Sequence, residues 1–223
     1  SPEFLFSDLE AWGGGHNNGF NEYIESSTDK LCILDIGAHV GLTILPLCEM
    51  SSNKTKIYGF EPSSRNFDAL KFNVKLNNCH KVILENCLVG EEDVHEALFY
   101  ETDDISATSS IVNNENRNFE KTFKKQVSID SYCQKNNLCP DLIKIDVEGA
   151  EISVLRGAKE TMKRFKPTIF LSVHPNQILQ LGGSEEDLLE IINYCGYSIS
   201  NIDGSQIDKF ESVEYLMTAN KGI

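Results

Sequence analysis

Residues 142–151 read LIKIDVEGAE, an apolar run of strand length that ends in three acidic residues, Asp146, Glu148 and Glu151. Helical apolar spacing follows over 149–164, and the same order of strand, turn and helix recurs from residue 31 onward. Such alternation predicts a doubly wound, mostly parallel α/β sheet, in which ligands bind outside the carboxyl ends of the strands. Asp146 should therefore lie at the ligand-binding edge of the sheet.

The expected elements follow from this pattern. The expected strands are 31–37, 56–62, 82–90, 141–147 and 167–175, with further extended segments at 95–100, 124–130, 197–202 and 214–220. The expected helices are 40–50, 63–77, 130–137, 149–164 and 185–196, and Ser63 and Asp130 are the expected N-caps of the second and third. The polar stretch 101–118 is the longest expected loop.

Composition narrows the function classes. The 223 residues carry a formal net charge of −14 and a pI near 4.7, which argues against nucleic acid and anionic membranes as partners. No apolar run reaches the roughly 18 residues of a membrane span. The seven cysteines are odd in number and lack CxxC spacing, so we expect reduced, structural thiols in a cytoplasmic protein. The oligomeric state cannot be read from the sequence.

The chain divides into three expected parts. SPEF at 1–4 resembles the scar of an expression vector. Residues 5–30 contain WGGGHNNG (12–19) and are expected to be either a lead-in or a lid. Residues 31–223 are expected to form a single domain, since no repeat, low-complexity tract or linker divides them.

The first motif is DIGAHVG at 35–41. Gly37 permits a tight turn after the strand, and Gly41 allows the next helix to pack closely. Backbone N–H groups at such a helix start can face an anionic group. The spacing is not G-x-G-x-x-G and no Walker lysine follows, so a triphosphate site is disfavoured; a tight turn without a ligand remains the alternative.

The second motif is GFEP at 59–62, where Glu61 ends a strand 24 residues after Gly37. An acid about 20 residues beyond the glycine turn can bind ribose hydroxyls, although it could also be a solvated surface acid. Two nucleoside cofactors fit the two motifs, NAD and S-adenosylmethionine. The missing middle glycine disfavours the pyrophosphate of NAD.

The third motif joins the opening stretch to LSVHP at 171–175. Asp146 and His174 end neighbouring strands, so one substrate could reach both, and a histidine can act as a general base near neutral pH. A helix N-cap role for Asp146, a structural role for His174 and a helix-dipole role for Glu151 are the alternatives. Asp146, Glu148 and His174 could instead hold a Mg²⁺ ion.

These residues resemble a known family. DIGAHVG, GFEPSSRNFDALKFNVKLNN, VSIDSY, DLIKIDVEGAEISVLRGAKE and KPTIFLSVHP stand in the order typical of FkbM-type methyltransferases, over about residues 31–175. The resemblance implies a Rossmann-like class I methyltransferase fold with seven strands, the last antiparallel. It also implies an S-adenosylmethionine-dependent O-methyltransferase acting on a hydroxyl of a saccharide or natural product.

The resemblance also assigns roles by position. Asp35, Gly37 and Gly41, with Ala38 and His39 in the same turn, would line the methionine part of the cofactor. Glu61 would hold the ribose, and Asn86 would lie on the adenine side. Asp146, Glu148 and His174 would face the transferred methyl group and the acceptor. His39 replaces a frequent Asn and Ser172 a frequent Glu, so the acceptor here could be held differently.

Two other functions stay open at this point. One is a non-catalytic S-adenosylmethionine-binding module that kept the fold, and the other is a nicotinamide-dependent oxidoreductase. Binding of S-adenosylhomocysteine or of NADH distinguishes them. The primary prediction is an O-methyltransferase with His174 as base and Asp146 orienting it or binding the acceptor hydroxyl.

Overall fold

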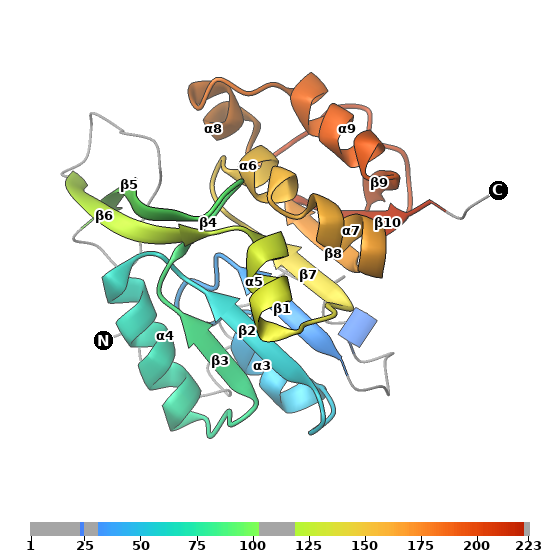
Figure 1. Ribbon diagram of the computed structural model, residues 1–223. Coiled ribbons are helices and arrows are strands. Elements are labelled where there is room, and N and C mark those ends of the chain that lie inside the picture. The colour runs from blue at the N-terminus through green and yellow to red at the C-terminus, as the bar shows by residue number, and fades with distance from the viewer. Residues whose placement is uncertain (1–22, 25–30, 103–118, 221–223) are drawn as a thin grey trace.

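A seven-stranded sheet forms the centre of the molecule (Figure 1). The computed structural model describes residues 23–24, 31–102 and 119–220. In sheet order the strands are β3 (Val82–Glu85), β2 (Lys56–Phe60), β1 (Cys32–Ile36), β7 (Leu142–Ile145), β8 (Thr168–Ser172), β10 (Glu214–Ala219) and β9 (Tyr197–Asn201). β10, the last strand along the chain, is antiparallel to both of its neighbours in the sheet, β8 and β9. The predicted doubly wound, mostly parallel sheet with an antiparallel last strand is confirmed.

Helices cover both faces of this sheet. One core cluster joins Ile143 and Ile145 of β7 to the first group of helices, and a second joins Leu142 to the other group. The first group is α5 (Ile129–Asn136), α6 (Glu151–Arg156), α7 (Lys159–Phe165), α8 (Pro175–Gln180) and α9 (Glu185–Tyr194), and the second is α3 (Ile44–Met50) and α4 (Ser64–Leu76). Successive strand residues point to opposite faces, so every residue of β7 is buried.

The expected strand at 82–90 is two strands in two sheets. After β3 the chain leaves the large sheet, and β4 (Leu88–Val89) joins a three-stranded sheet of order β4-β6-β5. Its other members are β5 (Val94–Thr102) and β6 (Phe119–Val127), which pair antiparallel. The expected loop at 101–118 lies almost entirely outside the described residues.

The expected helix at 149–164 is interrupted between α6 and α7. A Cβ atom at Gly157 would stand 2.0 Å from the carbonyl oxygen of Gly90, beside β4. A side chain at position 157 is therefore incompatible with this contact between backbones. The small sheet packs against the α6–α7 break at this point, a long-range contact that helical periodicity does not reveal.

Helix caps were predicted partly correctly. The Ser63 side chain accepts the Asn66 N–H at the start of α4, as expected. The cap of α5 is Ser128 rather than Asp130, because the Ser128 hydroxyl accepts the Ser131 N–H. Asp130 instead accepts the N–H groups of Glu160 and Thr161, which positions the start of α7.

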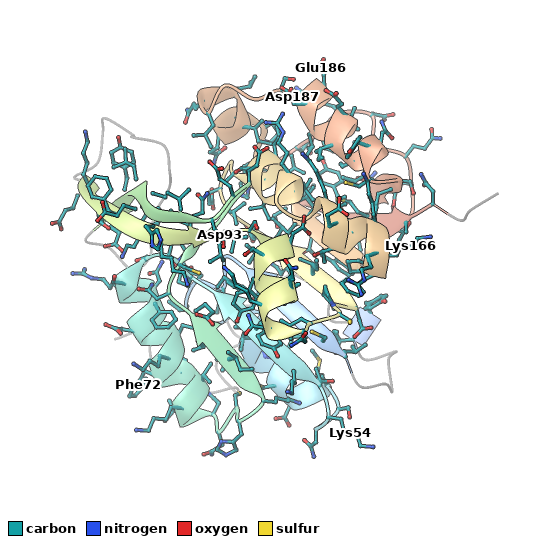
Figure 2. All side chains as sticks on the ribbon, in the orientation of Figure 1. Lys54, Phe72, Asp93, Lys166, Glu186 and Asp187 are labelled. Carbon is teal, nitrogen blue, oxygen red and sulfur yellow. The ribbon has the colours of Figure 1, made fainter. Side chains whose placement is uncertain are left out.

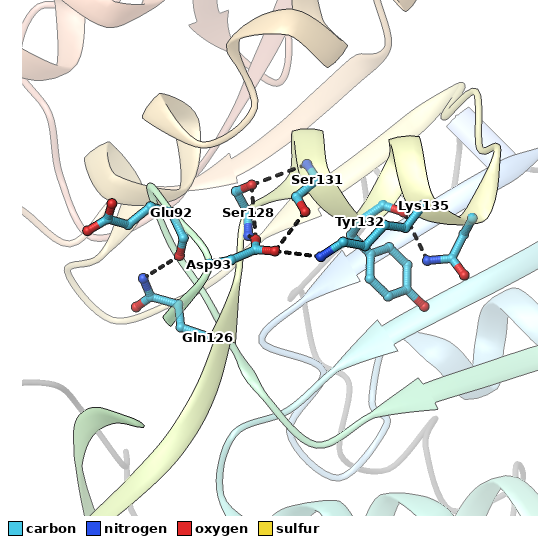
Figure 3. Close-up of polar contacts among 8 residues, drawn as sticks. Glu92, Asp93, Gln126, Ser128, Ser131, Tyr132 and Lys135 are labelled. Atoms are coloured by element: carbon cyan, nitrogen blue, oxygen red, sulfur yellow. Dashed lines mark hydrogen bonds and ion pairs between the residues drawn. The ribbon is translucent and has the colours of Figure 1, made fainter. Parts of the chain in front are cut away.

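Asp93 connects the small sheet to α5 (Figure 3). Its carboxylate accepts the Ser128 N–H at 2.9 Å, the Ser131 hydroxyl at 2.7 Å and the Lys135 ammonium at 2.7 Å. The hydrogen bond from Lys135, with those from the two serines, holds the pKa of Asp93 well below its usual range. These hydrogen bonds hold the segment directly before β5 against α5.

Charged side chains such as Lys54, Lys166 and Glu186 are directed outward, and some large apolar side chains, Phe72 among them, are exposed as well (Figure 2). All seven cysteines are free thiols. Among the described helices, none combines the length and the apolar character needed to cross a membrane. The predicted scar at 1–4 and all of the lead-in 5–30 except residues 23–24 lie outside the described residues.

Candidate active site

The predicted site residues gather at one edge of the large sheet. The strands β1, β2, β3, β7 and β8 are parallel, so their carboxyl ends share that edge. Glu61 directly follows β2, Asn86 follows β3, Asp146 follows β7, and His174 lies two residues past β8. The sequence-based placement of these residues is therefore correct.

The glycine turn after β1 packs directly on the end of β7. Gly37 has a φ of +88°, and a Cβ atom there would lie 1.8 Å from the Asp146 carbonyl oxygen. Glycine is the residue that tolerates both conditions. Gly41, at φ +101°, packs against Leu70 of α4 rather than against the strand. The turn thus fixes the position of the Asp146 backbone.

The N–H groups of this turn already have partners within the protein. Gly37 and Ala38 donate to the Phe60 carbonyl at 3.0 and 2.9 Å, and His39 donates to the Glu61 carboxylate at 2.9 Å. Helix α3 begins only at Ile44, with Pro46 in its first turn, where proline is tolerated. The N–H groups of Gly37, Ala38 and His39 are therefore already occupied, whereas the expectation that N–H groups at the helix start face an anion stays a prediction.

Glu61 links two turns of the edge. One carboxylate oxygen accepts the His39 N–H and the other accepts the Ser63 N–H, each at 2.9 Å. Burial raises the pKa of Glu61 to about 7, against the lowering effect of these hydrogen bonds. Asn86 donates its amide to the carbonyls of Glu61 and Pro62, so it holds the end of β2 in place.

A lysine inside the sheet organises the acids, and the sequence analysis missed it. Lys144 is paired with Asp35 in the register of β1 and β7, and its ammonium lies 3.0 Å from the Asp146 carboxylate. Burial lowers the pKa of Lys144, but the charges of Asp146, Asp35 and Glu214 raise it by more than burial lowers it, so the net change is upward. The lysine in the otherwise apolar run LIKI was the available signal.

Asp35 and Glu214 have carboxylate oxygens that are shielded from solvent without a hydrogen-bond partner among the described residues. Asp35 is fully buried, and neither of its oxygens has a hydrogen-bond partner among the described residues. One buried oxygen of Glu214 likewise has no such partner. Burial raises the pKa of Asp35 to about 6 and that of Glu214 to about 7. Glu214 also escaped prediction, because only the pairing of β10 with β8 brings it to the edge.

His174 lies among three carboxylates. Its Nδ1 is 2.7 Å from Glu151 Oε1, and its Nε2 is 3.7 Å from Asp146 Oδ1 and 3.6 Å from Glu148 Oε2. Burial lowers the pKa of His174, but the Glu151 hydrogen bond and the three negative charges raise it, and the net change is upward. The structure therefore brings together the three residues predicted to face the acceptor.

The pKa values of the two acids beside His174 move apart. Burial raises the pKa of Asp146, but Lys144 and His174 lower it, and the net change is downward. Burial raises the pKa of Glu148, despite the opposing charge of His174. Asp146, Glu148 and His174 each offer one ligand atom within 4.8 Å of the other two, a separation that a divalent cation could bridge.

Glu151 belongs to this site, although one sequence reading gave it only a helix-dipole role. It is the first residue of α6, but its side chain is fully buried and accepts the Gly149 N–H at 3.0 Å as well as contacting His174. Val154, Leu155 and Ala158 are buried too, so Glu151 continues the apolar face of this segment. That helical spacing was visible in the sequence and indicated an inward-facing acid.

Comparison with known protein families assigns the chain. The family described as Methyltransferase FkbM domain matches residues 35–199. The chain belongs to the FkbM methyltransferase family. The resemblance inferred from the sequence motifs is thereby confirmed.

Individual relatives of this FkbM-family chain agree. Methyltransferase 1 of Beauveria bassiana (strain ARSEF 2860) is 29% identical to it over an alignment that covers 58% of this chain and 59% of that protein. The crystal structure of methyltransferase FkbM from Methylobacillus flagellatus KT matches with a TM-score of 0.60 at 18% identity, over 94% of this chain and 50% of that one. The chain thus spans 50–59% of the length of these two relatives.

A third solved structure shares the fold. The O-methyltransferase from Bacillus cereus in complex with SAH matches with a TM-score of 0.52 at 14% identity, over 98% of this chain and 92% of that one. At this identity the similarity shows the fold alone, a class I methyltransferase sheet.

Proposed function

We propose that this protein transfers a methyl group from S-adenosylmethionine to a hydroxyl group of a small molecule such as a saccharide or a natural product. The observation that carries the proposal is the position of His174. Its Nε2 atom lies at the same sheet edge as the Gly37 turn, beside Asp146 and Glu148. A proton acceptor at this point suits a hydroxyl nucleophile, which must lose its proton.

The cofactor fits the acids at the edge. S-adenosylmethionine carries a sulfonium and an ammonium group and supplies an electrophilic methyl group when bound. Asp35, Asp146 and Glu214 oppose a single ammonium, that of Lys144, and Asp35 has no hydrogen-bond partner among the described residues. A cationic ligand would offset this excess of negative charge, of which Asp35 is the buried member. The family and the SAH-bound B. cereus neighbour support the same cofactor.

The nicotinamide alternative fits less well. A dinucleotide pyrophosphate needs free backbone N–H groups at the glycine turn. Here the N–H groups of Gly37, Ala38 and His39 donate to Phe60 and Glu61. For S-adenosylmethionine, Glu61 would bind the ribose and the region of Asn86 would lie beside the adenine, as the sequence resemblance predicts.

The acceptor side is assigned to the residues past β7 and β8. His174 takes the proton of the acceptor hydroxyl through Nε2, while Asp146 and Glu148 bind the acceptor. Asp146 is kept ionised by Lys144 at 3.0 Å, so it can accept a hydrogen bond from a second hydroxyl of a polyol. The competing role for Asp146, Glu148 and His174 is a Mg²⁺ site, which their proximity permits.

Two measurements test this function. Calorimetry with S-adenosylhomocysteine and with NADH separates the cofactors; binding of NADH alone would overturn the proposal. Transfer of labelled methyl from S-adenosylmethionine to a panel of sugars and polyketides then tests the reaction. Tight S-adenosylhomocysteine binding without transfer to any hydroxyl of the panel would favour a non-catalytic binding module.

A further inference from the structure

Among the described residues, Glu151 has one charged partner within reach, and that partner is His174. The carboxylate is fully buried, with Oε1 at 3.0 Å from the Gly149 N–H and 2.7 Å from His174 Nδ1. Its Oε2 atom has no hydrogen-bond partner in the described part of the chain. A buried carboxylate that is only partly hydrogen-bonded is costly, so its contact with the imidazole accounts for its presence.

This contact decides which nitrogen of His174 is available. An ionised carboxylate can only accept a hydrogen bond, so Nδ1 must carry the proton. In the neutral ring Nε2 is then the nitrogen with the free lone pair. Nε2 lies 3.6 and 3.7 Å from the Glu148 and Asp146 oxygens, beyond hydrogen-bond distance, so neither acid occupies it.

We propose that Glu151 is the positioning residue of the site, which fixes the Nδ1–H tautomer and the orientation of His174 so that Nε2 receives the acceptor proton. In this step the acceptor O–H bond breaks and an Nε2–H bond forms. The oxygen keeps the electron pair and would use it to bond the methyl carbon of S-adenosylmethionine. The methyl–sulfur bond would break with its electron pair going to sulfur, so that S-adenosylhomocysteine leaves, and the imidazolium later returns its proton to solvent. The same division of labour operates in Ser-His-Asp triads, where a buried acid orients the histidine that deprotonates an aliphatic hydroxyl.

The other charged groups around His174 do not have this geometry. Asp146 and Glu148 face Nε2 from the turn after β7, and Lys144 holds Asp146 from inside the sheet. From α8, the Gln177 amide donates to the Glu148 carboxylate at 3.3 Å. Glu151 alone among these acids contacts Nδ1. In this proposal Glu151 takes the orienting role, and Asp146 keeps the other role predicted for it, binding the acceptor hydroxyl.

Nitrogen-15 NMR of the histidine side chains tests the positioning role without any acceptor. The chain has five histidines, and comparison with His174→Asn assigns the signal. In the wild-type protein, with or without S-adenosylhomocysteine, the neutral His174 ring should show the Nδ1–H pattern. Free histidine prefers the other tautomer, so an Nε2–H pattern in the wild type would overturn the proposal.

The Glu151→Gln variant tests the charge, and Glu160→Gln is the matched control. Glu160 is likewise an acid in the first turn of a helix, but its side chain is exposed. The amide introduced by Glu151→Gln can present either its oxygen or its NH₂ group to Nδ1, so this variant should show mixed tautomers, while Glu160→Gln keeps the wild-type pattern. An unchanged His174 pattern in Glu151→Gln would refute the charge-based positioning.

Kinetics connect this role to the reaction, and this part rests on the proposed function. With an acceptor found in the methyl-transfer panel, Glu151→Gln should lower kcat by about 100-fold, with S-adenosylhomocysteine affinity unchanged. Glu151→Asp, which keeps the charge, should recover part of the loss. The tautomer result stands independently: an Nδ1–H pattern without transfer to any hydroxyl would reject the proposed function and keep the positioning role. Equal kcat for Glu151→Gln and Glu160→Gln would reject the role in the reaction.

Discussion

Replacing Asp35 with asparagine should stabilise the free protein at pH 8 while weakening binding of S-adenosylmethionine. Asp35 is fully buried without a hydrogen-bond partner among the described residues, and burial raises its pKa from 3.8 to about 6. Because the pKa of Asp35 is higher in the folded than in the unfolded protein, its contribution to the free energy of unfolding is fully present below pH 3.8. This advantage is lost as the pH rises through about 6.

The magnitude follows from the same pKa values. The difference between 3.8 and about 6 corresponds to about 3 kcal/mol, at 1.36 kcal/mol per pH unit. Asparagine has the shape of the protonated acid and no charge, so Asp35→Asn should recover up to about 3 kcal/mol at pH 8 and about half of that at pH 5. The cofactor should bind about 10-fold more weakly, since the excess of negative charge that attracts its ammonium is reduced by one.

Urea unfolding at pH 5 and pH 8, in the absence of ligand, measures the first effect, and calorimetry measures the second. Leu34→Met, a conservative change at the neighbouring core position, controls for general disturbance of β1. A variant that is less stable than the wild type at pH 8, or equally shifted at both pH values, would refute the reasoning. Unchanged affinity for S-adenosylmethionine would remove Asp35 from the cofactor site.

Three further outcomes are expected. His174→Ala should lower turnover by about 100-fold or more while cofactor affinity is retained. A strong chelator should leave wild-type activity intact. Activity that is lost to the chelator and restored by Mg²⁺ would instead assign Asp146, Glu148 and His174 to a metal site. Gly37→Ala should cost more than about 3 kcal/mol in urea unfolding, because of the 1.8 Å clash, whereas Gly196→Ala, at φ +74° with open space around it, should cost about 1–2. Asp93→Asn should lower the free energy of unfolding by about 1 kcal/mol at neutral pH. Since folding lowers the pKa of Asp93, its contribution to stability is present above pH 3.8 and is lost as the pH falls further. The stability difference between variant and wild type should therefore disappear in strong acid. Equal costs for the two glycine changes, or a pH-independent cost at Asp93, would contradict these accounts.

The strand ends could be predicted because they depend on local pattern. Alternation of short apolar runs with helical segments determines a parallel sheet, and a parallel sheet gathers its carboxyl ends at one edge. Asp146 and His174 were placed correctly on that argument alone. Glu151 could also have been placed, since it continues the buried helical face through Val154 and Leu155.

Other features depend on contacts between distant segments. Glu214 reaches the site only through the pairing of β10 with β8, and Gly157, at the break between α6 and α7, is required to be glycine by its contact with Gly90. Asp130 was the predicted cap of α5, but Ser128 caps this helix, and the Asp130 carboxylate instead accepts an N–H at the start of α7. Local propensity favoured both residues as caps, and the packing of α7 decided between them.

The approach of Gly157 to Gly90 also bears on how relatives can diverge. Two backbones in direct contact leave no room for a side chain at position 157, so that position should tolerate change only if the chain near residue 90 shifts with it. The contact joins the residue after β4 to the residue after α6, the helix that begins with Glu151. A substitution at position 157 would therefore disturb the small sheet and the helix that positions Glu151 together, so the two parts should change in concert among relatives.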